Sequence, residues 1–134
     1  MEIHHIGYLV KNLNKAMNSF TVLGFEVISD QTRDEYRGVD IVFMQNGGYV
    51  IELVSPYRDD SVVSAMIRRI GNTPYHICYT VDNIEQTADF LRTNGYAPID
   101  TPTIAPAIDS RRVCFLAHPK IGLIELVERE ASVE

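Results

Sequence analysis

The chain has only two cysteines and no long apolar run, and these absences exclude several classes of protein. Cys78 and Cys114 each lie within an apolar stretch, and two isolated cysteines do not form the disulfide framework of a small secreted protein. No segment approaches the roughly 20 apolar residues that a membrane-spanning helix needs. The first residues also lack the charged and then apolar pattern of a signal peptide. We therefore expect a cytoplasmic protein without a membrane partner.

Basic residues are scarce as well. The chain has 12 Lys and Arg against 18 Asp and Glu, a formal net charge of −6, whereas binding to nucleic acid requires a clustered basic surface. We therefore expect no nucleic-acid partner. With 134 residues, 46% of them hydrophobic and 22% charged, the composition is typical of a globular protein that forms a single domain with its own core.

The sequence contains an internal repeat. Residues 5–13 (HIGYLVKNL) match residues 76–84 (HICYTVDNI) at an offset of 71, with five of nine positions identical. Residues 51–54 and 124–127 share the sequence IELV at an offset of 73. The change of offset needs only two additional residues in the second copy. A unit of this length that occurs twice indicates an internal duplication within one domain.

Each copy has the pattern of one strand, one helix and three further strands. Runs rich in β-branched and aromatic residues predict the strands, and apolar residues at helical spacing before a glycine predict the helix. The first copy covers about residues 3–54 and the second about 75–128 of a single domain, residues 1–134. A helix over about 59–71 bridges them, and the proline-containing segment 101–110 is expected to be a loop. The fold class is therefore α+β.

Each copy begins with a histidine and ends with a glutamate. Side chains alternate along a strand, so His5 and His76 lie on the face opposite the apolar residues that pack under the helices. Glu52 and Glu125 interrupt apolar strands, where a carboxylate is costly unless it is paired or coordinated. No Lys or Arg recurs at equivalent positions, which favours a metal over an ion pair. The alternative is that the glutamates face solvent and the histidines are ordinary core residues.

Such a set of ligands restricts the metal only loosely. Two imidazoles and two carboxylates suit one divalent ion such as Zn²⁺, Ni²⁺, Co²⁺, Mn²⁺ or Fe²⁺, and they do not select among these. They also leave coordination positions for water or a substrate.

Two residues next to the candidate ligands receive no role. Cys78 shares the face of His76, and we interpret it as a small buried hydrophobic residue in place of Gly7. His4 precedes His5 on the same strand, so alternation predicts that its side chain points the other way.

Two arginines, Arg111 and Arg112, follow the proline-containing segment and could bind a carboxylate or phosphate of a small molecule. Arg111 is the better candidate for substrate binding because its neighbour begins the strand. The alternative is that both are solvated surface charges.

The chain resembles the vicinal oxygen chelate superfamily, also called the glyoxalase/bleomycin-resistance/dioxygenase group, over nearly its whole length. The motifs that carry the resemblance are HIG from residue 5, YHIC from residue 75, and IEL from residues 51 and 124. The resemblance implies two tandem βαβββ modules that form a cupped, mostly antiparallel sheet around a metal site. It implies His5, Glu52, His76 and Glu125 as the metal ligands. It also implies a homodimer, which is common among paired-module proteins of this kind.

Within this superfamily the chain is most similar to the methylmalonyl-CoA epimerases, through PYHIC from residue 74, FLAHPK from residue 115 and Asp60-Ser61. This similarity implies a metal-dependent epimerase or isomerase that removes an α proton from an acyl thioester through a metal-stabilised enolate. Glu125 is the first candidate for the base and Glu52 the second. Tyr36 stands where epimerases carry a second catalytic carboxylate, which makes Glu35 the candidate for that role, with Asp34 as the alternative.

Alternative functions stay open within the same superfamily. A lactoylglutathione lyase would act on a hemithioacetal and return the proton to the neighbouring carbon. A drug-binding resistance protein would use the fold without chemistry, although that group usually lacks the four ligands. A ring-cleaving dioxygenase normally has three protein ligands, and this chain offers four.

Overall fold

The computed structural model describes residues 1–130 of the chain, which divides into two compact units. The N-terminal unit is His5–Tyr75, and the C-terminal unit is the chain from His76 onward together with Met1–His4. The N-terminal unit therefore holds most of the first copy of the repeat and the bridging helix. The first four residues are the exception, because they belong to the unit of the second copy.

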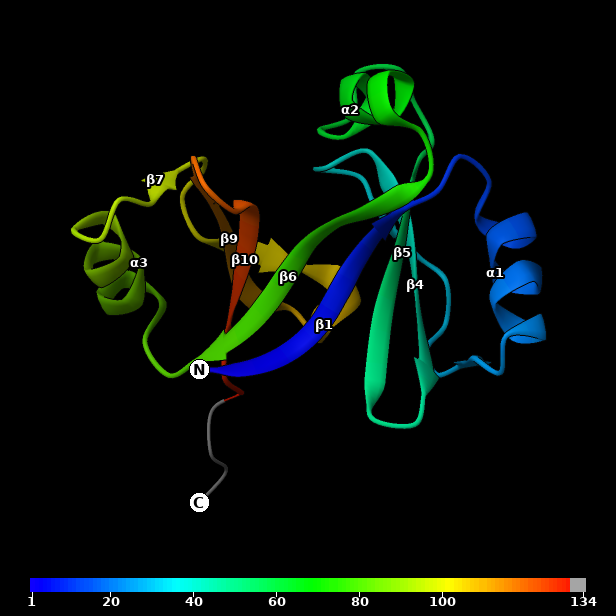
Figure 1. Ribbon diagram of the computed structural model, residues 1–134, viewed down its shortest axis with the longest axis horizontal. Coiled ribbons are helices and arrows are strands. Elements are labelled where there is room, and N and C mark those ends of the chain that lie inside the picture. The colour runs from blue at the N-terminus through cyan, green and yellow to red at the C-terminus, as the bar shows by residue number, and fades with distance from the viewer. Residues whose placement is uncertain (131–134) are drawn as a thin grey trace. The chain divides into compact units, whose positions relative to one another are not determined.

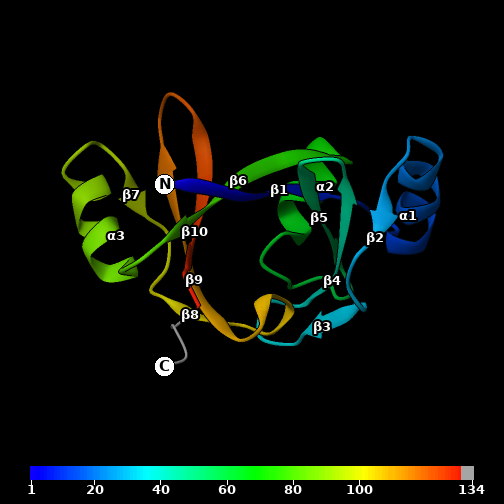
Figure 2. The ribbon, with the colours of Figure 1, turned by 90° about the horizontal axis from the view of Figure 1, so that it is seen from below.

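In the N-terminal unit the strands follow the order β2-β4-β5-β1, with β3 also paired to β4. Figure 1 labels β1, β4 and β5, and Figure 2 also labels β2 and β3. Strand β1 runs parallel to β5, and the other pairings are antiparallel. The elements are β1 (Glu2–Leu9), α1 (Leu13–Val22), β2 (Glu26–Val27), β3 (Thr32–Asp34), β4 (Val39–Asn46), β5 (Tyr49–Pro56) and α2 (Ser64–Ile70).

The first helix of this unit begins at a capped turn and covers one face of the sheet. The side chain of Asn12 accepts a hydrogen bond from the backbone N–H of Lys15 at 2.9 Å, which satisfies a donor of the first turn. From α1, Leu13 packs with buried residues of β4 and β5, including Met44 and Leu53. This apolar cluster lies on one face of β4 and β5 and leaves the opposite face for other side chains.

In the C-terminal unit the order is β6-β10-β9-β7, with β8 also paired to β9 (Figure 2). Strand β10 is parallel to β6, and the remaining pairings are antiparallel. The helix is capped as in the other unit, because Asn83 accepts from the backbone N–H of Gln86 at 3.0 Å. The elements are β6 (Thr73–Val81), α3 (Ile84–Arg92), β7 (Ala97–Pro98), β8 (Thr103–Ala105), the short 3₁₀ helix η1 (Pro106–Ile108), β9 (Arg111–His118) and β10 (Gly122–Glu128).

The predicted α+β class and the strand, helix and three-strand plan of each copy are confirmed, with one short strand added to each. Strands β3 and β8 have three residues each. The prediction of a loop over 101–110 was therefore wrong in part, because β8 and η1 lie within that segment. Three-residue strands form through pairing with distant strands, and so few residues carry no periodic pattern of their own.

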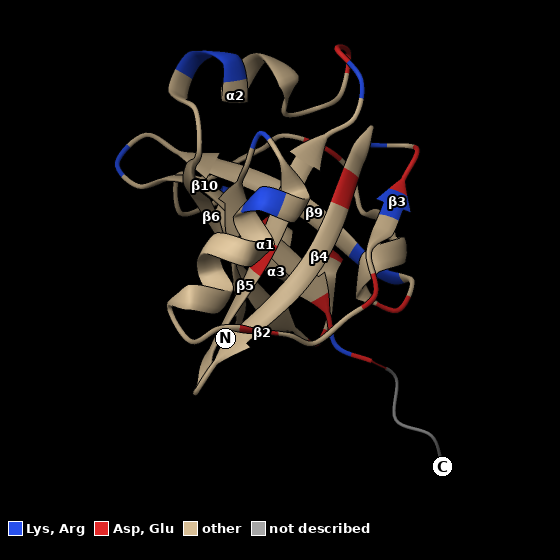
Figure 3. Ribbon diagram, turned by 90° about the vertical axis from the view of Figure 1, so that its right-hand side faces the viewer, with Lys and Arg blue, Asp and Glu red and all other residues tan. Residues whose placement is uncertain are grey.

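The bridging helix is shorter than predicted. It occupies Ser64–Ile70 and not 59–71, and Arg68 and Arg69 stand in its last turn as the basic stretch on α2 in Figure 3. Residues 59–63 form turns before it. No helix among the described residues is both long and apolar enough to cross a membrane.

Candidate metal centre

In the N-terminal unit, β1 and β5 bring a histidine and a glutamate together. Gly7 pairs with Glu52 in the parallel register, and His5 lies two residues before Gly7, so all three positions share one face. The Nε2 atom of His5 is 3.5 Å from Oε1 of Glu52. Phe43 pairs with Glu52 from β4, and its ring packs edge-on against the His5 imidazole with centroids 5.3 Å apart.

The C-terminal unit repeats this arrangement. Cys78 pairs with Glu125 in the parallel register of β6 and β10, and His76 lies two residues before Cys78. The Nε2 atom of His76 is 3.1 Å from Oε1 of Glu125. Phe115 pairs with Glu125 from β9, and its ring packs edge-on against His76 with centroids 5.2 Å apart.

Each histidine and glutamate pair has the chemistry and the spacing of two ligands to one divalent ion. The histidines are 1% and 4% exposed and both glutamates are 4% exposed, and buried carboxylates of this kind need a compensating charge. Two atoms bound to one ion at about 2.1 Å, at angles of about 90–110°, are about 3.0–3.4 Å apart. The distances of 3.5 Å and 3.1 Å within the two pairs are close to this range. Both pairs therefore fit a metal with mixed nitrogen and oxygen ligands.

The two arginines that begin β9 have different partners. Arg111 shares the face of Phe115, four residues further along the strand. Its Nε donates to the backbone carbonyl of Glu128 at 2.8 Å. In the part of the chain that the structure describes, no acceptor lies within hydrogen-bonding distance of its two Nη groups.

Arg112 points to the opposite face and is engaged by two carboxylates. Its guanidinium donates to Glu85 and to Glu128, with Nη2 2.8 Å from Oε2 of Glu128. These hydrogen bonds lower the pKa of both Glu85 and Glu128 from the usual carboxyl range. The same bonds raise the pKa of Arg112. Arg112 therefore ties β9 to the start of α3 and to β10.

The remaining predicted residue, Glu35, lies in the exposed turn that follows β3. Its backbone carbonyl accepts a hydrogen bond from Nη1 of Arg58 at 2.8 Å. The carboxylate that is buried in this segment is instead that of its neighbour Asp34.

Asp34 belongs to a buried ion pair that the sequence analysis did not predict. It pairs with Val39, four residues before Phe43 on β4, so Asp34 lies on the face of the His5 and Glu52 pair. Its Oδ1 accepts from the backbone N–H of Arg37 at 2.9 Å and its Oδ2 from Nη1 of Arg37 at 2.8 Å. In the sequence, the sign of this pair is an aspartate, Asp34, that is followed three and four residues later by Arg37 and Gly38.

The chain is similar to known proteins in both sequence and structure. The sequence model of the Glyoxalase/Bleomycin resistance protein/Dioxygenase superfamily matches residues 4–115. The mitochondrial methylmalonyl-CoA epimerase of Dictyostelium discoideum is 30% identical over 131 residues, which cover 96% of this chain and 77% of the relative.

Two solved structures are similar along almost the whole chain. A variant of the Streptomyces coelicolor methylmalonyl-CoA epimerase in complex with 2-nitronate-propionyl-CoA has a TM-score of 0.82 at 26% identity, over 98% of this chain and 99% of that one. A methylmalonyl-CoA epimerase in complex with methylmalonyl-CoA and NH4+ has a TM-score of 0.81 at 26% identity, over 97% and 95% of the two chains. The family model spans most of the chain, and both units carry the same buried pair of potential ligands. The protein therefore belongs to the glyoxalase/bleomycin resistance protein/dioxygenase superfamily.

Proposed function

We propose that this protein is a divalent-metal-dependent epimerase or isomerase that moves the α proton of an acyl-CoA thioester. The observation that carries the proposal is the duplicated, buried pair of histidine and glutamate, one in each unit. The similarity to methylmalonyl-CoA epimerases over nearly the whole chain supports the substrate class.

Under this proposal His5, Glu52, His76 and Glu125 together hold one divalent ion. The ion is Zn²⁺, Ni²⁺, Co²⁺, Mn²⁺ or Fe²⁺, since imidazole and carboxylate ligands accept each of these. When bound, it supplies a positive charge that stabilises the negative charge on a thioester oxygen as the α proton leaves. The four side chains neutralise its charge, because each glutamate contributes one negative charge and the histidines are neutral as ligands.

Glu125 is the proposed base. Its Oε1 lies 3.1 Å from Nε2 of His76, whose ring packs against Phe115, and the carboxylate is buried, which restricts the positions that the acceptor oxygen can take. Fixed geometry lowers the cost of proton transfer, because the carboxylate does not have to be ordered in the transition state. Glu52 is the second candidate, with a longer separation of 3.5 Å from its histidine. Glu35 stays a prediction for a second acid or base, from an exposed position.

Arg111 is proposed to bind an anionic group of the substrate, a carboxylate or a phosphate. Its hydrogen bond to the carbonyl of Glu128 fixes the guanidinium plane through Nε. The two Nη groups are then available for the paired hydrogen bonds that a carboxylate or phosphate accepts from arginine. Arg112 does not suit this role because Glu85 and Glu128 already neutralise it.

The proposed assembly is a homodimer in the cytoplasm, and both parts of this statement are predictions from the sequence. Gel filtration with light scattering tests the dimer. Fractionation of the source cells tests the location.

Metal content and proton exchange test the proposal together. Protein purified without added metal is expected to contain close to one divalent ion per chain. Removal of that ion is expected to lower the free energy of unfolding by about 2.7 kcal/mol if metal was present at about 100 times its dissociation constant. A chain without metal, whose stability a chelator leaves unchanged, would support the drug-binding alternative.

Exchange of the substrate α proton in D₂O distinguishes the reactions. We expect exchange with methylmalonyl-CoA and none with the methylglyoxal hemithioacetal of glutathione. The opposite result would assign the lyase reaction, and exchange with neither substrate in metal-loaded protein would reject the acyl-CoA proposal.

A further inference from the structure

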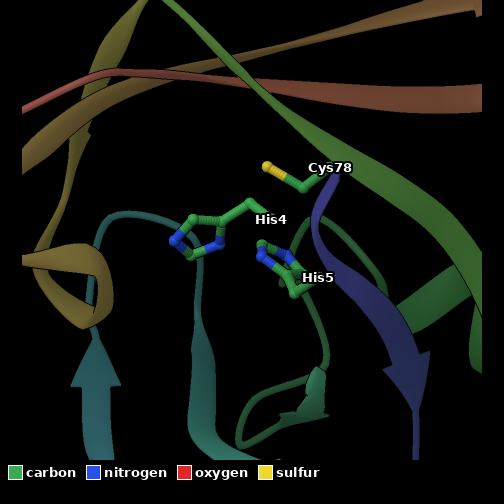
Figure 4. A group of neighbouring side chains, drawn as sticks. All are labelled: His4, His5 and Cys78. Atoms are coloured by element: carbon green, nitrogen blue, oxygen red, sulfur yellow. The ribbon is translucent and has the colours of Figure 1, made fainter. Parts of the chain in front are cut away.

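The C-terminal unit holds two further potential metal ligands, His4 and Cys78, beside the histidine and glutamate pairs. They belong to a group whose third member is His5, the next residue of β1, and Figure 4 draws the three side chains together. A ring nitrogen of His4 and the Sγ of Cys78 lie within 4.8 Å of one another. Strand alternation predicted that His4 points away from such a face, and this prediction was wrong. A twisted strand turns its side chains progressively, so strict alternation does not fix which neighbouring strand a side chain meets.

One of the two donors differs in kind from those of the predicted metal centre. That centre offers imidazole nitrogen and carboxylate oxygen, whereas Cys78 offers sulfur. Thiolate is the ligand that Cu(I) and related soft cations prefer, and imidazole also binds copper. An ion placed about 2.3 Å from sulfur and about 2.1 Å from nitrogen separates the two atoms by at most about 4.4 Å. The observed spacing accommodates such an ion with little movement of either side chain.

The surroundings of the two cysteines support the site. Cys78 is fully buried, and His4, the other donor, is half-buried. The other cysteine, Cys114, lies on the opposite face of the unit in the apolar cluster formed by α3, β9 and β10. Burial there raises the pKa of the Cys114 thiol to about 12. The two cysteines of the chain therefore have different surroundings, and only Cys78 belongs to a group of potential metal ligands among the described residues.

We propose that His4 and Cys78 form a binding site for a soft cation of the Cu(I) and Ag(I) class. Binding forms a bond from sulfur to the ion and releases the thiol proton to solvent, so no oxidant or reductant is needed. Cys78 pairs in register with Glu125 and follows His76 by two residues. An ion on its sulfur therefore occupies space beside that pair. We expect it to inhibit the reaction, an effect that rests on the proposed function, whereas the binding itself does not.

The test is an anaerobic titration of the full chain with Cu(I) in competition with a chromophoric Cu(I) chelator. Wild-type protein is expected to withdraw one equivalent of Cu(I) from the chelator. Cys114→Ser is the matched control and is expected to behave as wild type. Cys78→Ser is expected to lose this equivalent, and His4→Asn to weaken it by about tenfold or more, because one of two bonds to the ion is removed.

Three outcomes would overturn the site: unchanged Cu(I) binding in Cys78→Ser, equal loss in Cys114→Ser, or wild-type affinity in His4→Asn. If Cys78→Ser does not fold, Cys78→Gly replaces it, because glycine is the residue at the equivalent Gly7 of the other unit. Melting temperature and circular dichroism establish folding for each variant. Failure of proton exchange in untreated protein would reject the proposed function and leave this result unaffected.

Discussion

The two units use the same strand register to bring a histidine and a glutamate together. In each, the glutamate pairs with a phenylalanine of the antiparallel neighbour, and that ring packs edge-on against the histidine. In each, an asparagine caps the helix that covers the other face. Under the proposed function, these shared features let each unit present its two potential ligands in the same way.

The units differ at one end of the sheet face that carries the histidine and the glutamate, where the three-residue strand pairs with the start of the following long strand. Asp34 and Ala105 occupy equivalent positions, because each ends a three-residue strand and pairs with the first residue of the following long strand. Those first residues are Val39 and Arg111. One unit therefore carries a buried carboxylate held by Arg37, and the other carries an arginine. The two units therefore differ in the charge that they place at this position, although their pairs of histidine and glutamate are the same.

The largest expected difference between the units is catalytic. Glu125→Gln is expected to lower the rate of α-proton exchange by about 10³-fold, because a positioned general base contributes roughly 10²–10⁴. Glu52→Gln, the matched change in the other unit, is expected to reduce metal content with a smaller loss of rate per bound ion. Exchange in D₂O and metal analysis of both variants measure this. Wild-type exchange in Glu125→Gln would remove Glu125 from the mechanism.

The next comparison concerns the two phenylalanines that support the histidines. Phe43→Ala is expected to cost about 3–5 kcal/mol of stability, because the ring is 7% exposed and its loss leaves a cavity. Phe115→Ala is expected to cost less, since Phe115 is only half-buried. Urea denaturation of both variants measures the difference. Equal losses would mean that the two rings support their histidines to the same extent.

The helix caps should behave alike. Asn12→Ala and Asn83→Ala each remove one side-chain acceptor from the first turn of a helix. Each is expected to lower the free energy of unfolding by about 1 kcal/mol. Thermal denaturation at neutral pH checks this, and a clear difference between the two variants would show that the units are not equally dependent on their helices.

The smallest expected effect is a dependence on pH confined to the C-terminal unit. Arg112 lowers the pKa of Glu85 and Glu128, so their contribution to stability is present above the unfolded carboxyl pKa of 4.5 and is lost as the pH falls through the lowered values. Arg112→Gln is therefore expected to be less stable at pH 7 and to lose less stability than wild type between about pH 5 and pH 3. Arg92→Gln, which removes an exposed pair with Asp89, is the control.

The sequence alignment of the two copies predicted a useful part of this molecule. The face of His5 was predicted because strand alternation is a local property of the backbone, and Glu52 was grouped with it through the repeat and the family resemblance. The parallel register of β1 and β5 places the two side chains 3.5 Å apart. The helices were predicted because their apolar spacing and their stop signals are also local. The preference for Arg111 over Arg112 came from sequence position and stays a prediction. In the structure Arg112 lies on the other face with two carboxylate partners.

Other features could not be predicted because they depend on contacts between distant segments. Strands β3 and β8 exist through their pairing with β4 and β9. The proximity of His4 to Cys78 depends on the twist of β1, and the burial of Asp34 on a turn that returns Arg37 to it.

The amino-acid sequence by itself determined the duplication, the class of fold, and which residue types face each side of the sheet, because these follow from periodicity along the chain. Only the tertiary structure decided which of those residues come within bonding distance and which charges neutralise one another. The physical reason is that interatomic distances and burial depend on how strands pair and twist, and these are properties of segments far apart in the sequence.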